Sequence, residues 1–343
     1  MPIRLIRRLS IANLTLKLPT KSNLPKARMT LLHKIRTYSM TALVVALTSA
    51  SQLHASPGAS GYSASVPAPT LSNVAYGEHA RQVLDVWQAE SVDPSPLVVV
   101  IHGGSWKTGQ KEWVNRFVDV NALLEAGVSV AAINYRYTTQ AGDIQPPVAV
   151  PMGDAARAVQ FIRSKANEWN LDKTRIAGAG ASAGACTVLW LALHEDMAQP
   201  NSYDPVARES TRLWCAATIN AQTSLDPKQM KEWTPNSHYG AHAFGLNNFT
   251  EFLAERERIL PWITEYSPYS HLSDNDPPLY LFYKRAPALG QEQEDPTHSA
   301  NFGVTLKEVC DAIGVSCELA YTQKPEQIHT ECISDFLIKY LFL

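Results

Sequence analysis

From about residue 84 onward, short continuous apolar runs alternate with stretches in which apolar and polar positions are mixed. Residues 97–101 (LVVVI) and 128–134 (VSVAAIN) are continuous apolar runs rich in β-branched residues. Such runs are typical of strands that are buried on both faces of a parallel sheet. Similar short runs predict further strands at residues 174–178, 213–219, 278–283 and 317–321.

Amphipathic or apolar stretches separate these strands. In residues 151–167 the apolar side chains recur at the spacing of one helix face, and Pro151 fits the first helical turn. Residues 183–194 have almost no polar face, which indicates a buried helix. Two more helices are predicted at residues 304–313 and 333–341. Strands that alternate with helices predict an α/β fold, a three-layer α/β/α sandwich around a mainly parallel sheet.

Residues 222–270 interrupt this alternation. They are rich in aromatic and polar residues and contain one helical stretch, near residues 249–259. An insertion after a core strand is expected either to form a small cap over a pocket or to pack on the surface. We assign a single α/β domain to residues 73–343, with the insertion as its candidate cap.

The N-terminal region has the layout of an export signal. Nine Lys or Arg precede residue 40, no acidic residue precedes Glu78, and an apolar run at residues 40–50 leads to Ala55. A basic segment, a short apolar segment and small residues predict a signal peptide at residues 1–55, cleaved near Ala55, and hence a periplasmic or extracellular protein. Translation from Met29 would shorten the basic segment. A basic tail or an uncleaved anchor is the alternative. Residues 56–72, rich in Ser, Pro and Ala, are expected to be a flexible leader.

Cleavage changes the charge balance. Removing nine of 30 cations leaves 21 against 32 acidic residues, a net charge of −11 (21 − 32) with His neutral. An acidic domain repels phosphate backbones, so we expect no nucleic-acid partner. The apolar run at residues 40–50 is too short to cross a bilayer, so no stable membrane span is expected in the mature form. The oligomeric state stays open.

The five cysteines contain no CxxC pair, which argues against a zinc ribbon. Cys310 and Cys317 flank a short predicted turn, and either a disulfide or two buried thiols is compatible with that spacing. His238 and His242 have helical metal-ligand spacing, but Gly240 lies between them and no carboxylate accompanies them. No metal or cofactor is therefore expected.

The main chemical signal is a G-x-S-x-G pentapeptide at residues 180–184, with Ser182 at its centre. It lies between a predicted strand and a predicted helix, where a sharp turn lifts the serine hydroxyl clear of the sheet. A second segment, HGGSW at residues 102–106, directly follows the strand at 97–101. Backbone N–H groups of such a loop stabilise the oxyanion of acyl transfer. We predict the oxyanion hole to consist of the N–H groups of Gly103, Gly104 and Ala183.

Together, these two motifs resemble the hormone-sensitive-lipase-like branch of the α/β-hydrolases, in particular its feruloyl-esterase-like (BD-FAE-like) members. Residues 84–87 (LDVW) and 134–137 (NYRY) resemble further family segments, and Asp154 and Arg157 match an acidic and a basic position on the next helix. The resemblance covers about residues 74–342. Ala185 departs from it, because many members have another glycine there. That change is expected to affect packing more than chemistry.

The resemblance implies that an acid and then a histidine follow the nucleophile in the chain. His329, between the last predicted strand and the last helix, has the placement of the family's base, and His102 is expected to hold the loop. The acid usually lies just after the strand at 278–283, where this chain has none. Asp295, some ten residues later in an Asp-Pro pair, resembles the family's acid loop, with Glu292 and Glu294 as competitors.

These features predict a serine hydrolase of the carboxylesterase or lipase type with a Ser182–His329–Asp295 triad and no cofactor. The substrates expected are small esters or acyl groups linked to polysaccharide. Two alternatives stay open. One is an amidase, formamidase or exopeptidase on the same fold. The other is a catalytically inactive hydrolase that serves as a binding module.

Overall fold

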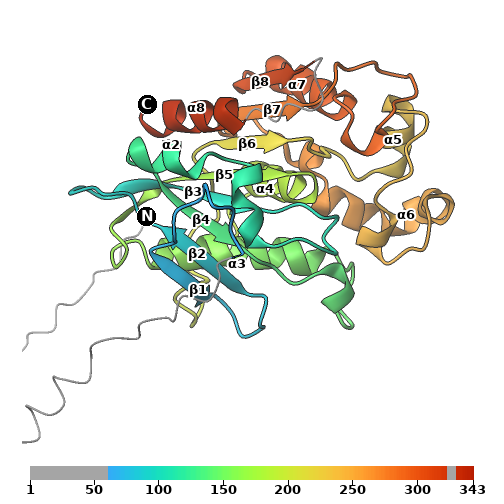
Figure 1. Cartoon of the computed structure of the whole chain (residues 1–343). Coiled ribbons are helices and arrows are strands. Elements are labelled where there is room, and N and C mark those ends of the chain that lie inside the picture. The colour runs from blue at the N-terminus through green and yellow to red at the C-terminus, as the bar shows by residue number, and fades with distance from the viewer. Residues whose placement is uncertain (1–60, 323–329) are drawn as a thin grey trace, which may run out of the picture. The chain divides into compact units, whose positions relative to one another are not determined.

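An eight-stranded sheet runs through the part of the chain that the computed structural model describes, residues 61–322 and 330–343 (Figure 1). Its order is β1-β2-β4-β3-β5-β6-β7-β8. The strands are β1 (Leu71–Ala75), β2 (Val83–Trp87), β3 (Ser95–Ile101), β4 (Ser129–Ile133), β5 (Leu171–Ala181), β6 (Ala216–Ile219), β7 (Leu279–Tyr283) and β8 (Cys317–Tyr321). β2 pairs antiparallel with β1 and β4, and every other pairing is parallel, which confirms the predicted mainly parallel sheet.

Helices cover both faces of this sheet. They are α2 (Val120–Glu125), α3 (Ala149–Ser164), α4 (Ala183–Leu193), α5 (Pro227–Trp233), α6 (Phe249–Tyr266), α7 (Asn301–Ile313) and α8 (Thr330–Leu341). In β3, Leu97 and Val99 pack into the apolar cluster that contains α3, α4 and α7, whereas Val98 and Val100 pack with α2 and α8. Successive strand residues point to opposite faces. The result is the three-layer sandwich of the α/β-hydrolase fold.

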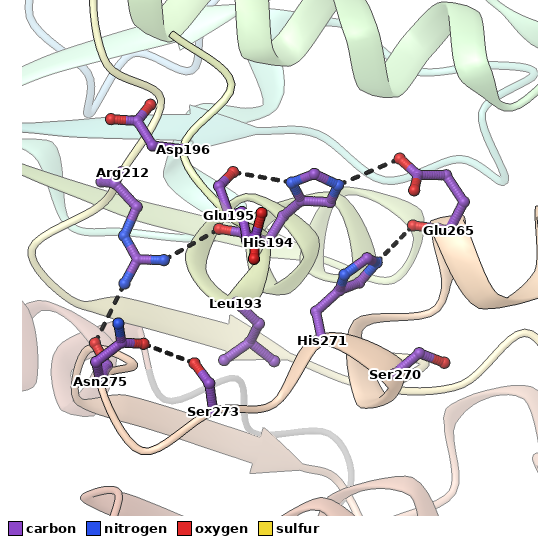
Figure 2. Close-up of a pocket in the computed structure, with 10 residues that line it drawn as sticks. All are labelled: Leu193, His194, Glu195, Asp196, Arg212, Glu265, Ser270, His271, Ser273 and Asn275. Carbon is purple, nitrogen blue, oxygen red and sulfur yellow. Dashed lines mark hydrogen bonds and ion pairs between the residues drawn. The ribbon is translucent and has the colours of Figure 1, made fainter.

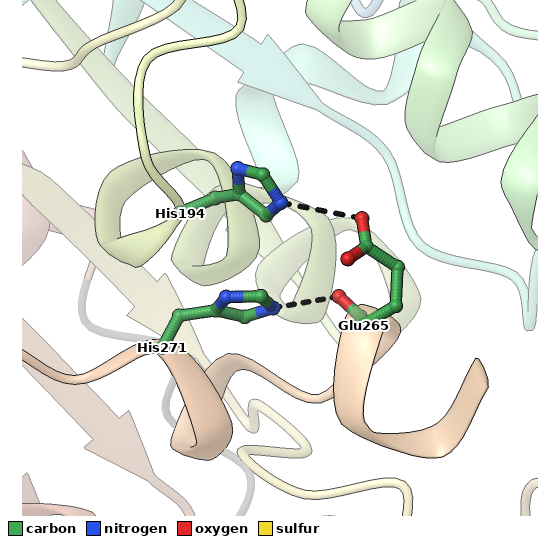
Figure 3. Close-up of side chains that lie close together, drawn as sticks. All are labelled: His194, Glu265 and His271. Atoms are coloured by element: carbon green, nitrogen blue, oxygen red, sulfur yellow. Dashed lines mark hydrogen bonds and ion pairs between the residues drawn. The ribbon is translucent and has the colours of Figure 1, made fainter. Parts of the chain in front are cut away.

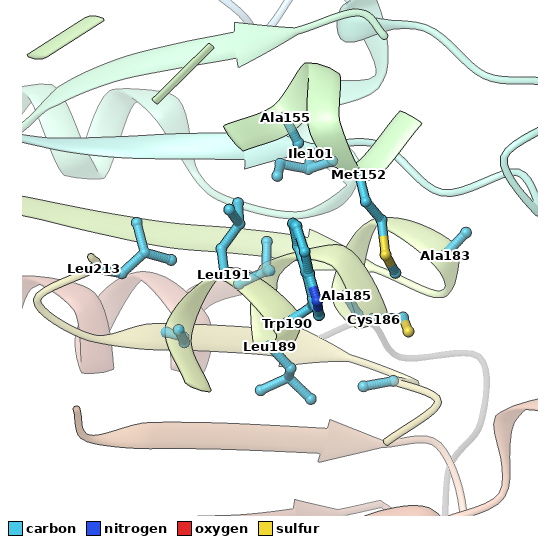
Figure 4. Packing of buried hydrophobic residues seen from close by; sticks show 14 of the residues in the cluster. Ile101, Met152, Ala155, Ala183, Ala185, Cys186, Leu189, Trp190, Leu191 and Leu213 are labelled. Carbon is cyan, nitrogen blue, oxygen red and sulfur yellow. The ribbon is translucent and has the colours of Figure 1, made fainter. Parts of the chain in front are cut away.

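Helix α4 is the most deeply embedded helix next to the sheet. All its residues from Ala183 to Leu193 are buried. Figure 4 shows it packed between β3, α3 and the segment before β6, with Trp190 close to Met152 of α3. A helix without a polar face is stable only where neighbours surround it. The sequence prediction of a buried helix is confirmed, and α4 gives the preceding residue, Ser182, a rigid support.

Between β6 and β7 the chain forms the insertion that the sequence indicated. It contains α5, the short 3-10 helix η4 (Ala241–Phe244), α6 and the 3-10 helix η5 (Pro268–His271). Helix α6 begins where Asn248 caps it, by accepting a hydrogen bond from the Glu251 N–H. It continues through Pro261 to Tyr266, seven residues beyond the predicted end at residue 259.

The predicted flexible leader, residues 56–72, needs correction in its described part. Tyr62 packs edge-on against Trp87 with ring centroids 5.1 Å apart, and its hydroxyl donates to Asp85 at 2.6 Å. The Trp87 indole donates to the carbonyl of Pro67 at 2.8 Å. An aromatic residue in a segment of small residues therefore anchors it to β2. The predicted signal peptide at residues 1–55 lies outside the described residues.

Two further expectations concern cysteines and membranes. Cys310 and Cys317 are both buried free thiols, so of the two alternatives the structure has the thiol pair. Among the described helices, none combines the length and the apolar character needed to cross a bilayer.

Candidate active site

Ser182 lies at the junction between β5 and α4. Its backbone has φ 53° and ψ −125°, a left-handed conformation that costs energy for a residue with a side chain. Its N–H donates to the Ile219 carbonyl of β6 at 2.9 Å, which holds the turn. A Cβ atom on Gly184 would collide with the backbone carbonyls of Ile101 and His102. Only glycine lets α4 approach β3 so closely, which explains the second glycine of the motif.

Two side chains from the loop after β7 complete a relay with this serine. The Ser182 Oγ lies 2.9 Å from Nε2 of His298, and Nδ1 of the same ring lies 2.8 Å from Oδ2 of Asp295. If Asp295 is ionised, it accepts the Nδ1–H, so Nε2 carries the lone pair that the serine hydroxyl faces. The hydrogen bond from His298 lowers the pKa of the Asp295 carboxyl, which keeps it ionised near neutral pH.

Local sequence explains how this pair forms. Asp295 caps the 3-10 helix η6 (Pro296–His298), and Pro296 occupies its first position. One short turn therefore places a carboxylate and an imidazole three residues apart on the same side. The buried Gln222, at the start of the insertion, donates to the Thr297 carbonyl at 2.7 Å and fixes this turn.

The predicted acid lies within the described residues, and the predicted base does not. Asp295 contacts an imidazole next to Ser182, whereas Glu294 pairs with Arg285 at 2.7 Å and contacts neither residue. That imidazole belongs to His298, which the sequence analysis did not single out. His329 lies outside the described residues, so its assignment stays a prediction. The Asp-x-x-His spacing was the available signal for His298.

The loop after β3 runs alongside the serine. A Cβ atom on Gly103 would lie 3.2 Å from the Ser182 Cβ and 2.7 Å from the Ala181 carbonyl oxygen. Gly104 has φ +107°, which a residue with a side chain rarely adopts. Among the described residues, no acceptor is found for the N–H groups of Gly103 and Gly104. Ala183 is the first residue of α4, where N–H groups lack a partner within the helix.

His102 holds this loop in place through contacts of its ring. Its ring is buried, stacks on Tyr135 at 4.2 Å, and donates from Nδ1 to the Gly103 carbonyl at 2.8 Å. Burial lowers the pKa of His102 to about 4, so it is neutral at pH 7. This arrangement agrees with the loop-holding role expected for it.

The insertion contacts the other side of the same loop. His242 of η4 donates from Nε2 to the Ser105 carbonyl at 3.0 Å, and its ring lies 6.3 Å from the Trp106 ring. Burial lowers the pKa of His242 to about 4 as well. His238 is exposed and His242 is bound to the loop, and the two do not belong to the one group of possible metal ligands among the described residues.

A polar cavity of about 200 Å³ adjoins His298. Two cations, Lys284 and Arg285, line it together with Asn220, Glu294 and Asp295. The described residues that line it include no large apolar side chain. A substrate portion that enters here is expected to be polar.

The BD-FAE family model matches residues 84–289, a segment that includes Ser182 and the glycine-containing loop at residues 102–106 and ends before Asp295. A probable isoprenylcysteine alpha-carbonyl methylesterase of Arabidopsis thaliana is 29% identical over 154 residues, 45% of this chain and 30% of that protein. Esterase LipC of Mycobacterium tuberculosis is 28% identical over 115 residues, 32% of this chain and 27% of that protein. The chain thus spans about a third of the length of these relatives.

Solved structures share the fold. A truncated carbohydrate esterase from gut microbiota superposes with a TM-score of 0.60 at 17% identity, covering 84% of this chain and all of that chain. The propionate-bound Est2 esterase of Thermogutta terrifontis has a TM-score of 0.58 at 18% identity, covering 78% of this chain and 92% of its own. At such identities the likeness establishes the fold alone.

Proposed function

The chain belongs to the BD-FAE family, and on this premise we propose that it is a serine esterase that cleaves carboxylic esters through an acyl-enzyme. The observation that carries the proposal is the relay in which Ser182, His298 and Asp295 lie 2.9 Å and 2.8 Å apart. Those distances are the ones at which a base takes a proton from a nucleophile and a carboxylate orients the base.

The chemistry follows from the relay. Ser182 Oγ attacks the ester carbonyl carbon while His298 Nε2 takes the hydroxyl proton, and Asp295 stabilises the imidazolium that forms. The carbonyl oxygen becomes an oxyanion that the N–H groups of Gly103, Gly104 and Ala183 are proposed to stabilise. His298 returns the proton to the departing alkoxide, and a water molecule then hydrolyses the acyl-enzyme by the same route in reverse.

Two histidines are candidates for the base. The geometry of the described residues supports His298, and the resemblance to the family supports His329. The Asp295 assignment serves both candidates, because the acid orients whichever imidazole acts on Ser182. The nucleophile and the oxyanion loop are likewise independent of this choice.

We propose an external substrate with a polar alcohol portion, such as acetyl or feruloyl groups on polysaccharide. The polar cavity beside His298, with Lys284 and Arg285 in its wall, favours a sugar over an isoprenoid chain. Burying an apolar chain there would remove water from Lys284 and from the exposed ion pair of Arg285 with Glu294 without replacement hydrogen bonds.

Two experiments test this proposal. A fluorophosphonate probe is expected to label wild-type protein and not Ser182→Ala, and failure to label the folded wild type would favour the inactive binding module. A panel of nitrophenyl acetate to palmitate, methyl ferulate, acetylated xylan and anilide analogues then defines the class. Highest kcat/KM on short or sugar-linked esters supports the proposal, whereas faster cleavage of the anilides would favour an amidase.

A further inference from the structure

The C-terminal end of α4 carries a second cluster of polar side chains. His194 follows the last residue of α4, Glu265 lies near the end of α6, and His271 ends η5 (Figure 3). One ligand atom from each of the three side chains lies within 4.8 Å of the others. The α4 helix separates this cluster from Ser182 by 11 residues, about 16 Å at 1.5 Å per residue.

The hydrogen bonds of the two imidazoles leave one nitrogen of each available. His194 donates from Nδ1 to the Glu195 carbonyl at 2.8 Å, and His271 donates from Nε2 to the Glu265 carbonyl at 2.7 Å. A histidine that donates one ring N–H to a backbone carbonyl has a lone pair on its other nitrogen. For His194 this is the outer hydrogen bonding that orients histidines in metal sites. The Nε2 of His271 faces Glu265 in Figure 3, so this ring has to turn over to present its lone pair to an ion held there.

The contact between His194 and Glu265 brings two possible metal ligands together. Nε2 of His194 lies 3.2 Å from Oε1 of Glu265. With its proton on Nδ1, His194 presents a lone pair to a carboxylate, and two acceptors at that distance repel each other. A proton shared between the two groups or a cation bound to both removes the repulsion, and the 3.2 Å separation is close to that of two ligand atoms on one metal ion.

The surroundings favour a cation. A cavity of about 720 Å³ opens at the cluster and is lined by three carboxylates, Glu195, Asp196 and Glu265 (Figure 2). Arg212 is the cationic side chain in that lining, and its guanidinium donates to the carbonyls of His194 and Asn275 at 3.1 Å and 3.2 Å. The open side of the cavity leaves room for a water ligand.

We propose that His194, Glu265 and His271 bind a divalent transition-metal ion, with zinc as the best match. Two imidazoles and one carboxylate, with water in the fourth position, are a ligand set that zinc accepts in tetrahedral geometry. Ligand atoms around such an ion lie about 3.4 Å apart, so the side chains need to close by about 1 Å.

The ion would fasten three elements to one another. It joins the end of α4 to α6 and η5, which belong to the insertion between β6 and β7. The Trp190 indole of α4 already donates to the Glu265 carbonyl at 2.8 Å, so the backbone there is held before any metal binds. At about 16 Å from the nucleophile, the ion is structural and takes no part in ester cleavage.

The test uses the tag-free protein, stripped with a chelator that is then removed. Titration calorimetry with Zn²⁺ is expected to give one site per chain, and a cobalt-loaded sample is expected to have the intense visible bands of four-coordinate Co²⁺. Saturating zinc should raise the melting temperature by several degrees, because it binds the native state. The kcat on nitrophenyl acetate should stay within twofold of the metal-free value.

Matched variants locate the site. Glu265→Gln keeps the backbone carbonyl that Trp190 and His271 contact, so its fold is expected to survive, and it should weaken zinc binding at least 10- to 100-fold. His271→Ala should do the same. Glu257→Gln on the same helix and His238→Ala are controls that should bind like wild type. Absence of zinc binding by wild type, or undiminished binding by both site variants, would overturn the proposal and leave an imidazolium–carboxylate pair.

Discussion

Replacing His298 by alanine removes the imidazole that lies 2.9 Å from the nucleophile. Without a base, Ser182 reacts as an ordinary hydroxyl, and members of a catalytic triad act as a unit. We therefore expect His298→Ala to lower kcat by about 10⁴-fold or more, with KM changing little. His238→Ala, an exposed histidine in the insertion, is the matched control and should keep wild-type kcat.

We expect a smaller loss of kcat when the acid, Asp295, is replaced. A buried triad aspartate is worth about 10⁴-fold, which corresponds to about 5.4 kcal/mol at 1.36 kcal/mol per factor of ten. The Asp295 side chain is 57% exposed, so water shares the task of stabilising the imidazolium. If solvent supplies about half of that energy, Asp295→Asn should lower kcat by about 10²-fold.

A double-mutant cycle then decides which histidine Asp295 serves. Initial rates on nitrophenyl acetate, with circular dichroism to verify folding, are measured for His298→Ala, Asp295→Asn, the double variant and His329→Ala. If Asp295 acts through His298, adding Asp295→Asn to His298→Ala costs almost nothing further. Three results together would refute the assignment of His298 and leave His329 as the base. Asp295→Asn would lower kcat by a further 10²-fold in the His298→Ala background, His298→Ala alone would stay within tenfold of wild type, and His329→Ala would be inactive.

Four more predictions concern stability, the oxyanion loop and export. The unfolded chain takes up protons on His102 and His242 near pH 6.5, whereas the folded chain does so near pH 4. Stability is therefore complete above pH 6.5 and falls as the pH drops toward 4, by about 3 kcal/mol for each group. Urea unfolding of His242→Gln should have a shallower pH dependence than that of wild type. Gly103→Ala should lower kcat about 10²- to 10³-fold, because its Cβ would lie 2.7 Å from the Ala181 carbonyl oxygen and displace an oxyanion donor. A normal kcat in that variant would argue against the loop's role. Gly153→Ala, on an exposed face of α3 where a Cβ meets nothing within 4 Å, should raise the free energy of unfolding by about 0.5–1 kcal/mol. N-terminal sequencing of exported protein should begin close to Ser56, and a start before residue 40 would contradict the predicted signal.

The sheet and its helices could be predicted because their apolar periodicity is strong. β8 was predicted at its observed bounds, and α4 within one residue. The boundaries were less accurate where polar residues extend an element. β5 begins at Leu171, three residues before the predicted start at residue 174, and this first part contains the charged residues Asp172 and Lys173. β1, five residues with two apolar positions of low burial, gave no clear signal.

The residues of the candidate site also differ in how far local sequence predicts their positions. Ser182 and the glycines of the oxyanion loop are close to buried strands, so local sequence places them. His298 reaches Ser182 across 116 positions of chain and through a loop of irregular length. Its location depends on tertiary contacts, such as the Gln222 side chain that holds Thr297, and no periodic pattern encodes these. The cluster of His194, Glu265 and His271, proposed as a metal site, was missed for the same reason, because its members come from three elements separated by up to 77 positions.

Helix α4 connects these observations. Its first turn follows the nucleophile and its end precedes His194, and all residues between are buried in a core that packs too densely to deform gradually. A displacement of its C-terminal end by the insertion would therefore be transmitted as a rigid shift to Ser182, where hydrogen-bond geometry tolerates little error. The hydrogen bond from the Trp190 indole to the Glu265 carbonyl already holds that end to α6 without metal, so the proposed ion adds stability there and its removal leaves kcat nearly unchanged. The position of the proposed ion, at the far end of the helix that carries the serine, is thus suited to stabilising the site while leaving its chemistry to the relay.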